Sequence, residues 1–286
     1  MVVNASGGKA SRAGEGLRDR LVEAFAAQGI TVSPQLVEGK DLATTLTNLA
    51  GCDVVAVGGG DGTLGSAAAS LSKAGQTMAV LPLGTLNHLS IDLGIPADLA
   101  EAAKIAVTGQ TRTIDLAQVG EQVFINNASV GLYTKLVRVR DAENLPKWLA
   151  TIPAAWTVLR AIKVRRLELD IGGARQVIKT PLLFIGNNRY NFTGERIGKR
   201  DALDRGELAL YAVSHRSALA LIGFALRTLL GRADADRDFT HISECAEFTL
   251  LGSGPIHVAH DGEVSEMSLP LRFASLPHAL KVRVSA

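Results

Sequence analysis

A run of glycines that carries one carboxylate and one hydroxyl is the strongest chemical signal in this sequence. The apolar residues 54–57 are followed directly by Gly58-Gly59-Gly60-Asp61-Gly62-Thr63. Glycines let a backbone approach a phosphate closely, and a helix that begins after such a loop offers free N–H groups. Because a carboxylate repels phosphate, Asp61 would act through Mg²⁺ or water, or would hold the loop. The alternative is a glycine-rich turn in which Asp61 caps the helix.

Three later segments carry polar residues of the same kind. They read Pro82-Leu83-Gly84-Thr85-Leu86-Asn87-His88, Asn126-Asn127-Ala128-Ser129-Val130-Gly131 and His260-Asp261-Gly262-Glu263. Asp-Gly is also a favoured pair in type I′ hairpin turns, so the third segment alone is equally a turn with an exposed carboxylate. Two common phosphate-binding patterns do not fit. A GxGxxG match at Gly60 lacks an acidic residue at the next strand end, and no glycine is followed by Lys and Ser or Thr.

Together these motifs resemble a known family. Gly-Gly-Asp-Gly-Thr after an apolar strand is similar to the nucleotide-binding motif of diacylglycerol, sphingosine, ceramide and NAD kinases and of phosphofructokinases. The other segments are similar to the Pro-x-Gly-Thr-x-Asn-Asp-Phe, Asn-x-x-x-x-Gly and Asp-Gly-Glu motifs of the diacylglycerol kinase catalytic-domain family, in family order. The resemblance covers almost the whole chain and implies an active site between two domains.

By that resemblance, the phosphates of ATP and a Mg²⁺ ion would contact the two glycine loops and the first strand. The corresponding residues are Asn4, Gly59, Gly60, Asp61, Gly62, Thr63, Gly84, Thr85 and Asn87. Glu263 corresponds to the catalytic base, which would take the proton of a lipid hydroxyl as that oxygen attacks the γ-phosphorus. Asp261 would support Glu263, or would share the metal with Asp61.

Four residues depart from the family pattern. His88 stands where the second loop usually has Asp, and Gly65-Ser66 stands where Asn-Glu usually follows the first loop. Arg205 occupies the position of an Asp that ligates a structural metal in bacterial relatives. Because Arg carries no acceptor, either Asp204 replaces that Asp or the second metal is absent, and we expect absence.

Hydrophobic patterning predicts the elements that position these residues. Before residue 111, β-rich runs alternate with helical patterns, which indicates a parallel sheet. Strands are predicted at 1–3, 30–32, 54–57 and 78–81, and helices at 11–28, 42–49, 64–73 and 97–107. Antiparallel strands are predicted later, at 111–119, 122–126, 166–171, 177–186, 246–251, 256–259, 269–274 and 279–284. The sequence therefore predicts an α/β nucleotide-binding domain at 1–111 and a β-rich sandwich domain for the lipid at 112–286.

Composition narrows the class of protein. The 286 residues are 47% apolar, with 30 Lys and Arg against 28 Asp and Glu, a net charge of +2. This excludes a disordered chain and gives no reason to expect nucleic acid as a partner. The sequence starts without a secretion signal, and its most apolar stretch, residues 217–230, is shorter than the roughly 20 residues of a bilayer span. We therefore expect a cytoplasmic protein.

Two segments have the composition of a membrane or headgroup contact. Residues 135–166 hold eight basic residues and both tryptophans, and the tryptophans and three of the basic residues lie within one predicted helix at 145–164. Such a helix suits peripheral attachment to the inner face of the membrane, and a core helix with snorkelling basic side chains fits equally. In the second segment, Arg189, Arg196 and Arg200 would meet an anionic headgroup or lie in a solvated loop.

The sequence thus predicts an ATP-dependent kinase that phosphorylates a lipid hydroxyl at the membrane surface. Diacylglycerol is the first candidate acceptor, followed by ceramide, a sphingoid base or another long-chain alcohol. An NAD kinase-like phosphotransferase fits less well, because the second loop and Asp-Gly-Glu match the lipid family. The other alternative is a nucleotide- or lipid-binding protein that has lost catalysis, which the departures at 65, 66 and 205 favour.

Overall fold

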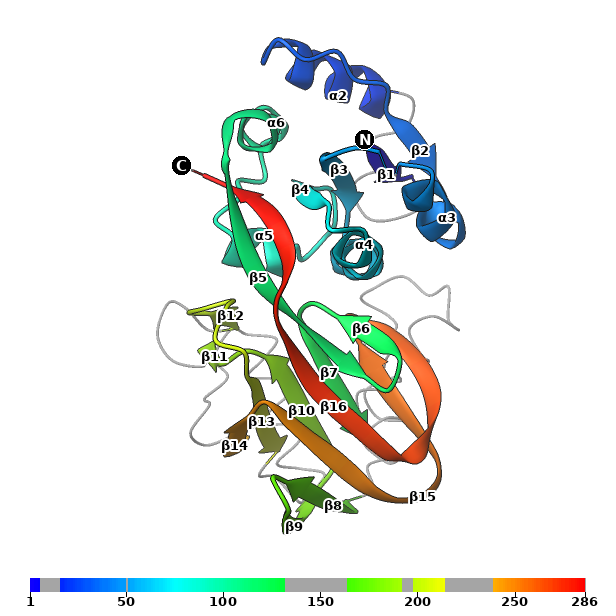
Figure 1. Ribbon diagram of the computed structural model, residues 1–286, viewed down its shortest axis with the longest axis vertical. Coiled ribbons are helices and arrows are strands. Elements are labelled where there is room, and N and C mark those ends of the chain that lie inside the picture. The colour runs from blue at the N-terminus through cyan, green and yellow to red at the C-terminus, as the bar shows by residue number, and fades with distance from the viewer. Residues whose placement is uncertain (6–15, 50, 132–163, 192–197, 214–238, 286) are drawn as a thin grey trace, which may run out of the picture.

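The computed structural model describes residues 1–5, 16–49, 51–131, 164–191, 198–213 and 239–285 (Figure 1). The predicted helix at 145–164, apart from its last residue, lies outside this part, as do the apolar stretch at 217–230 and Arg196. Within the described ranges, no helix is both long enough and apolar enough to cross a bilayer.

A parallel sheet with helices on both sides forms the first part of the chain. Its elements are β1 (Val2–Asn4), α2 (Gly16–Ala26), β2 (Gln35–Val37), the 3₁₀ helix η1 (Gly39–Asp41), α3 (Leu42–Thr47), β3 (Val54–Gly59), α4 (Asp61–Ala74), β4 (Thr77–Pro82), α5 (His88–Asp92) and α6 (Leu99–Thr108). The strand order is β4-β3-β1-β2. α2 packs with α6 and α3 with α4, on opposite sides of the sheet (Figure 1). Because helices cover both faces, β3 and β4 are buried along nearly their whole length.

Antiparallel strands dominate the rest of the described chain. They are β5 (Gln110–Val119), β6 (Gln122–Phe124), β7 (Asn127–Gly131), β8 (Arg165–Ile171), β9 (Ala174–Thr180), β10 (Leu182–Asn187), β11 (Tyr190–Asn191), β12 (Lys199–Arg200), β13 (Leu208–Val213), β14 (Phe239–Cys245), β15 (Glu247–His260) and β16 (Glu263–Val284). The predicted strands at 246–251 and 256–259 are one strand, β15, with an irregularity between Leu250 and Gly254.

The long strand β16 joins the two parts of the molecule (Figure 1). It pairs with β15 and β5, and near its end it runs parallel to β4. Leu280, Val282 and Val284 of β16 lie in the core of the α/β part, whereas Phe273 lies in the core of the β-rich part. The predicted α/β part and β-rich part are confirmed. The end of β16, which the sequence analysis assigned to the second domain, packs in the first core, and the boundary at 111 stays a prediction.

In the β-rich part, β13 and β14 were not predicted, and the predicted strand at 177–186 is divided between β9 and β10. In the α/β part, two short elements differ from the prediction. The second strand is β2, not residues 30–32, and the helix α5 was not predicted. β2 lies at the sheet edge with Leu36 42% exposed, and Ile30 is 43% exposed, so apolar character did not separate strand from loop there. α5 spans 5 residues, too few for a helical period to be recognised. This short helix nevertheless places two residues of the candidate site.

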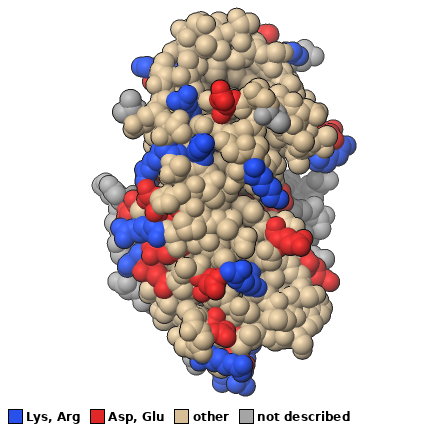
Figure 2. Space-filling view, viewed as in Figure 1, with Lys and Arg blue, Asp and Glu red and all other residues tan. Residues whose placement is uncertain are grey.

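Charged side chains are dispersed on the face that Figure 2 shows. Among the coloured residues, basic and acidic groups alternate over the β-rich half, and neither sign forms a broad field there. The mixture of basic and acidic residues on that face is consistent with the small net charge of +2.

Candidate active site

The two predicted glycine loops pack against each other at the ends of β3 and β4. A Cβ atom on Gly84 would lie 2.4 Å from Cα of Gly60, and one on Gly60 would lie 3.3 Å from Cα of Gly84. The loops can approach this closely only because both residues lack a side chain. Gly60 is the residue before α4, so the contact sits at the N-terminus of that helix.

The first strand also reaches this helix terminus. Asn4, at the end of β1, donates a hydrogen bond from Nδ2 to Oγ1 of Thr63 at 2.9 Å. A Cβ atom on Gly59 would lie 2.5 Å from that Thr63 side chain, so this position also requires glycine. The structure therefore brings together Asn4, Gly59 and Thr63, which the sequence separates into two segments.

Asn87 holds the second loop in shape. Its Oδ1 accepts a hydrogen bond from the Gly84 amide at 2.9 Å, and its Nδ2 donates to the Gly84 carbonyl at 3.1 Å. Asn87 is buried and has a left-handed backbone with φ of 55°. Its amide is thus engaged by the loop itself, whereas the neighbouring predicted contact, Thr85, is exposed.

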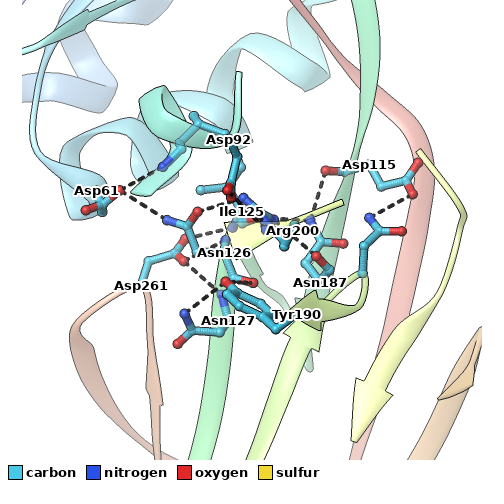
Figure 3. A network of polar contacts seen from close by, with 12 residues as sticks. Asp61, Asp92, Asp115, Ile125, Asn126, Asn127, Asn187, Tyr190, Arg200 and Asp261 are labelled. Carbon is cyan, nitrogen blue, oxygen red and sulfur yellow. Dashed lines mark hydrogen bonds and ion pairs between the residues drawn. The ribbon is translucent and has the colours of Figure 1, made fainter. Parts of the chain in front are cut away.

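Asp61 connects α4 with α5 and with the segment between β6 and β7. Its Oδ1 accepts a hydrogen bond from the Leu89 amide of α5 at 3.3 Å and from Asn126 Nδ2 at 3.4 Å (Figure 3). Asp61 is the first residue of α4, and its side chain does not cap that helix, because the N-cap is Gly60. Among the described residues no donor reaches Oδ2 of Asp61. A carboxylate with one oxygen held and the other open can bind a divalent cation.

Asp261 and Gly262 form the two-residue turn between β15 and β16, with φ of 44° and 90°. The predicted hairpin turn is therefore present, but the Asp261 carboxylate points inward. It accepts backbone N–H bonds from Ile125 at 2.7 Å, Asn126 at 2.8 Å and Asn127 at 3.3 Å (Figure 3). Burial raises the pKa of Asp261 to about 6, against the three N–H donors and Arg200, which lower it.

The Asp261 carboxylate also explains a glycine in α4. A Cβ atom on Gly65 would lie 2.5 Å from Oδ2 of Asp261. Gly65, one of the departures from the family pattern, therefore leaves the space that the carboxylate occupies. Because Asp261 already accepts three N–H bonds, the geometry favours a positioning role for it over direct metal binding.

Glu263 lies next to the first turn of α4. It is the first residue of β16, it is exposed, and its Oε1 would lie 3.7 Å from a Cβ atom on Gly62. The hairpin thus places a solvent-accessible carboxylate from the end of the chain beside the first glycine loop.

Arg200, which we predicted to contact a lipid headgroup, is buried in the structure. Its side chain is 1% exposed and pairs through Nε with Oδ2 of Asp92 at 2.8 Å. Nη1 donates to the carbonyls of Ile125 and Asn187, at 2.7 and 3.1 Å, and Nη2 donates to Asn126 Oδ1 at 2.9 Å. A buried guanidinium engaged in this way cannot reach a lipid headgroup, so that prediction is wrong.

The other two predicted headgroup residues differ from Arg200. Arg189 has a 67% exposed side chain and pairs with Glu244 at 3.3 Å. Arg196 lies outside the described residues. Their roles stay predictions.

The segment around Arg205, where we expected no second metal, is held by other contacts. Asp204 pairs with Arg112 at 2.8 Å. The Gly206 amide donates to Oδ2 of Asp115 at 2.6 Å, which also accepts from Asn188 Nδ2 at 3.1 Å. In the described part of the chain, no group of three His, Cys, Asp or Glu side chains is arranged to hold a metal ion.

Sequence reasoning missed Asp92, Asn126 and Asp115 as site or supporting residues. Asn126 was within reach of it, because it is the first residue of the Asn-x-x-x-x-Gly segment. Asp92 and Asp115 carried no local signal, since their partners lie 108 and 91 residues away along the chain.

Comparison with known proteins identifies relatives of this arrangement. Residues 1–119 match the diacylglycerol kinase catalytic domain. A "probable lipid kinase YegS-like" protein of Pseudomonas aeruginosa is 30% identical over 246 residues, which cover 83% of this chain and 78% of that protein. A protein of the same name from Klebsiella pneumoniae is 44% identical over 87 residues, and this match covers 29% of either chain.

Solved structures have the same fold. A crystal structure of a diacylglycerol kinase from Bacillus anthracis aligns over 99% of this chain and 95% of that chain, with a TM-score of 0.69 and 19% identity. A second structure from that organism gives a TM-score of 0.75 over 99% of this chain and 94% of that chain, with 20% identity. Considered with the Pseudomonas relative, the fold and the two loops lead to one conclusion: this chain belongs to the diacylglycerol kinase catalytic-domain family, together with the YegS-like lipid kinases.

Proposed function

We propose that this chain is an ATP-dependent lipid kinase that transfers the γ-phosphoryl group of ATP to a lipid hydroxyl, with diacylglycerol as the first candidate acceptor. The observation that carries the proposal is the position of Glu263 beside Gly62, the residue that follows Asp61 in the first turn of α4, although 202 positions separate Asp61 and Glu263 in the sequence. Phosphoryl transfer needs positioned phosphates and a carboxylate near the acceptor oxygen. The N–H groups at this helix terminus suit the first need, and the nearby Glu263 carboxylate suits the second.

The first loop would bind the phosphates. Gly60 and Gly62 bring backbone to the N-terminus of α4, where N–H groups face a bound anion. The Thr63 hydroxyl accepts from Asn4, which leaves its own proton for a phosphate oxygen. Mg²⁺ in nucleotide sites takes one or two carboxylates and completes its shell with phosphate oxygens and water, so the open Oδ2 of Asp61 fits it. When bound, Mg²⁺ would spread the charge that develops on the transferred group.

Glu263 would act as the general base. Its exposed carboxylate would accept the proton of the lipid hydroxyl as that oxygen forms a bond to the γ-phosphorus and the bond to ADP breaks. Asp261, held by three backbone amides, would keep the hairpin turn and hence Glu263 in place. Gly65 departs from the family pattern, but the Asp261 carboxylate occupies the space that a side chain at position 65 would need. This fit supports a retained activity.

Transfer of labelled phosphate from Mg·ATP to a micellar lipid panel tests the proposal. The panel holds diacylglycerol, monoacylglycerol, sphingosine, ceramide, undecaprenol and an anionic phospholipid, with NAD as a soluble acceptor. Labelled product from one lipid class, lost in Asp61→Asn, is the expected result. Label in NAD would support an NAD kinase-like enzyme instead. ATP binding without transfer to any acceptor would support the binding protein that has lost catalysis.

We also propose that the protein acts in the cytoplasm, at the inner face of the membrane, where its acceptor lies. The predicted basic helix with Trp148 and Trp156 supports this location by its composition. Co-sedimentation with anionic vesicles, compared between the wild type and a Trp148→Ser/Trp156→Ser variant, tests it. Equal sedimentation of the two proteins would contradict a role for this helix.

A further inference from the structure

A closed ring of hydrogen bonds surrounds the junction of the two parts of the molecule (Figure 3). Asp61 accepts from the Leu89 amide at the start of α5, and α5 ends at Asp92, which pairs with Arg200. Arg200 donates to Asn126, and Asn126 donates back to Asp61. Four separate segments of the chain thus contribute to one ring, which is closed through the backbone of α5.

The ring fixes the orientation of one amide. Arginine can only donate, so the group that faces Nη2 of Arg200 at 2.9 Å must be the oxygen of the Asn126 amide. An ionised aspartate can only accept, so the group that faces Oδ1 of Asp61 at 3.4 Å must be the nitrogen. Both neighbours require the same orientation, and Asn126 is 2% exposed, so water does not compete for it.

Arg200 itself is held rigidly. Its backbone amide donates to Oδ1 of Asp92 at 3.1 Å while its Nε donates to Oδ2 at 2.8 Å. Two carbonyls accept from Nη1, and the Tyr190 ring lies 5.7 Å from the guanidinium carbon. Both ionic side chains are nearly fully buried, at 1% and 2% exposure. The direction of Nη2 is therefore set by the fold and not by solvent.

We infer that Arg200 is a positioning residue for phosphoryl transfer, which acts through the Asn126 amide to hold Oδ1 of Asp61 and leave Oδ2 for the Mg²⁺ of Mg·ATP. This inference rests on the proposed function, because it assigns that cation to Asp61. Without Nη2, the Asn126 amide would be free to turn its oxygen toward the Asp61 carboxylate, where the two acceptors repel. Residues that orient the ligands of a metal typically change its affinity 10- to 100-fold when they are replaced.

The test compares Arg200→Lys, Asn126→Ala and the double variant, with Arg175→Lys on the exposed surface of β9 as the control. Calorimetry gives the affinity for Mg·ATP, and the Mg²⁺ concentration for half-maximal transfer gives the kinetic effect. Arg200→Lys and Asn126→Ala are each expected to raise the Mg²⁺ concentration for half-maximal transfer about 10-fold or more. The double variant is expected to need no more Mg²⁺ than Asn126→Ala. Effects that multiply in the double variant, or a Mg²⁺ dependence equal to that of the control, would overturn the inference.

A readout independent of turnover separates this inference from the proposed function. In ¹⁵N-resolved NMR spectra, the side-chain amide protons of Asn126 should exchange slowly with water in the wild type and rapidly in Arg200→Lys. Equal exchange rates would overturn the inference. Slow wild-type exchange together with Mg·ATP binding but no phosphate transfer would refute the proposed kinase activity and leave the role of Arg200 in orienting Asp61 toward Mg²⁺. Absence of Mg·ATP binding would refute both. If Arg200→Lys does not fold, Asp92→Asn, which removes the charge that fixes the guanidinium, replaces it in each comparison.

Discussion

Replacing Gly65 by alanine tests whether Asp261 and α4 fit together as the structure indicates. The new Cβ would lie 2.5 Å from Oδ2 of Asp261, about 0.9 Å closer than ordinary contact at 3.4 Å. The carboxylate cannot move that far without stretching bonds to backbone amides that are 2.7 and 2.8 Å long. Gly62→Ala is the matched control, because in the same helix its Cβ would meet nothing closer than 3.6 Å.

The two substitutions should change the free energy of unfolding in opposite directions. Alanine is favoured over glycine inside a helix by up to about 1 kcal/mol, so Gly62→Ala should be neutral or stabilising. In Gly65→Ala this gain is opposed by the loss of one or two hydrogen bonds to a charged group, about 1.5–3 kcal/mol each. The net loss of about 0.5–6 kcal/mol should lower the midpoint of thermal unfolding, by several degrees near the middle of this range.

A second pair of variants isolates the contact. Asp261→Gly removes the carboxylate, and glycine also accepts the positive φ of this turn position. In the Asp261→Gly background, Gly65→Ala should therefore no longer destabilise the protein. Thermal and urea unfolding of the four proteins give this coupling free energy. Equal stability of Gly65→Ala and Gly62→Ala would refute the fit between α4 and the hairpin turn.

Three further predictions concern pH and stability. Burial raises the pKa of Asp261 from 3.8 to about 6, so the stability that its protonated form contributes is complete below pH 3.8 and is lost as pH rises through 6. Urea unfolding between pH 4 and 7 should therefore show a steeper decline for the wild type than for Asp261→Asn, and parallel profiles would contradict this. Asn87→Ala should be about 1 kcal/mol less stable than Asn87→Gly, because the backbone there is left-handed; the reverse order in thermal unfolding would be inconsistent with that conformation. Arg112→Ala breaks a pair with Asp204 in which the side chains are 47% and 35% exposed, so it should change the free energy of unfolding by less than about 1 kcal/mol, and a larger loss in urea would contradict the solvent-exposed geometry.

Much of the first half of the fold follows from the sequence. The buried strands β3 and β4 appear as continuous apolar runs because helices cover both of their faces. The same logic failed at β2, an edge strand with exposed residues, where apolar patterning carries little information. Several of the later strands were located, but β13, β14 and the course of β16 were not. The pairing of β16 with β4 depends on partners some 200 residues away.

The candidate site was predictable where a residue acts through a local motif. Gly60, Asp61 and the Asp261–Glu263 turn each belong to a short pattern with its own chemistry. Arg200 shows the limit of this reasoning. It belongs to a basic segment, which suggested a headgroup contact, but its carboxylate partner, Asp92, lies 108 residues earlier in the sequence. A basic residue is assigned to solvent or to the interior by partners that only the tertiary structure supplies.

The most direct test of the central claim, that phosphoryl transfer occurs at the first turn of α4, is the comparison of wild type and Glu263→Gln in a single measurement of labelled phosphate transfer, with ATP affinity measured in parallel. Glutamine keeps the size of the side chain but cannot accept the hydroxyl proton, so turnover should fall by about 10²–10⁴-fold while ATP affinity changes little. Unchanged turnover in Glu263→Gln would remove this carboxylate from the reaction and contradict the account of the site.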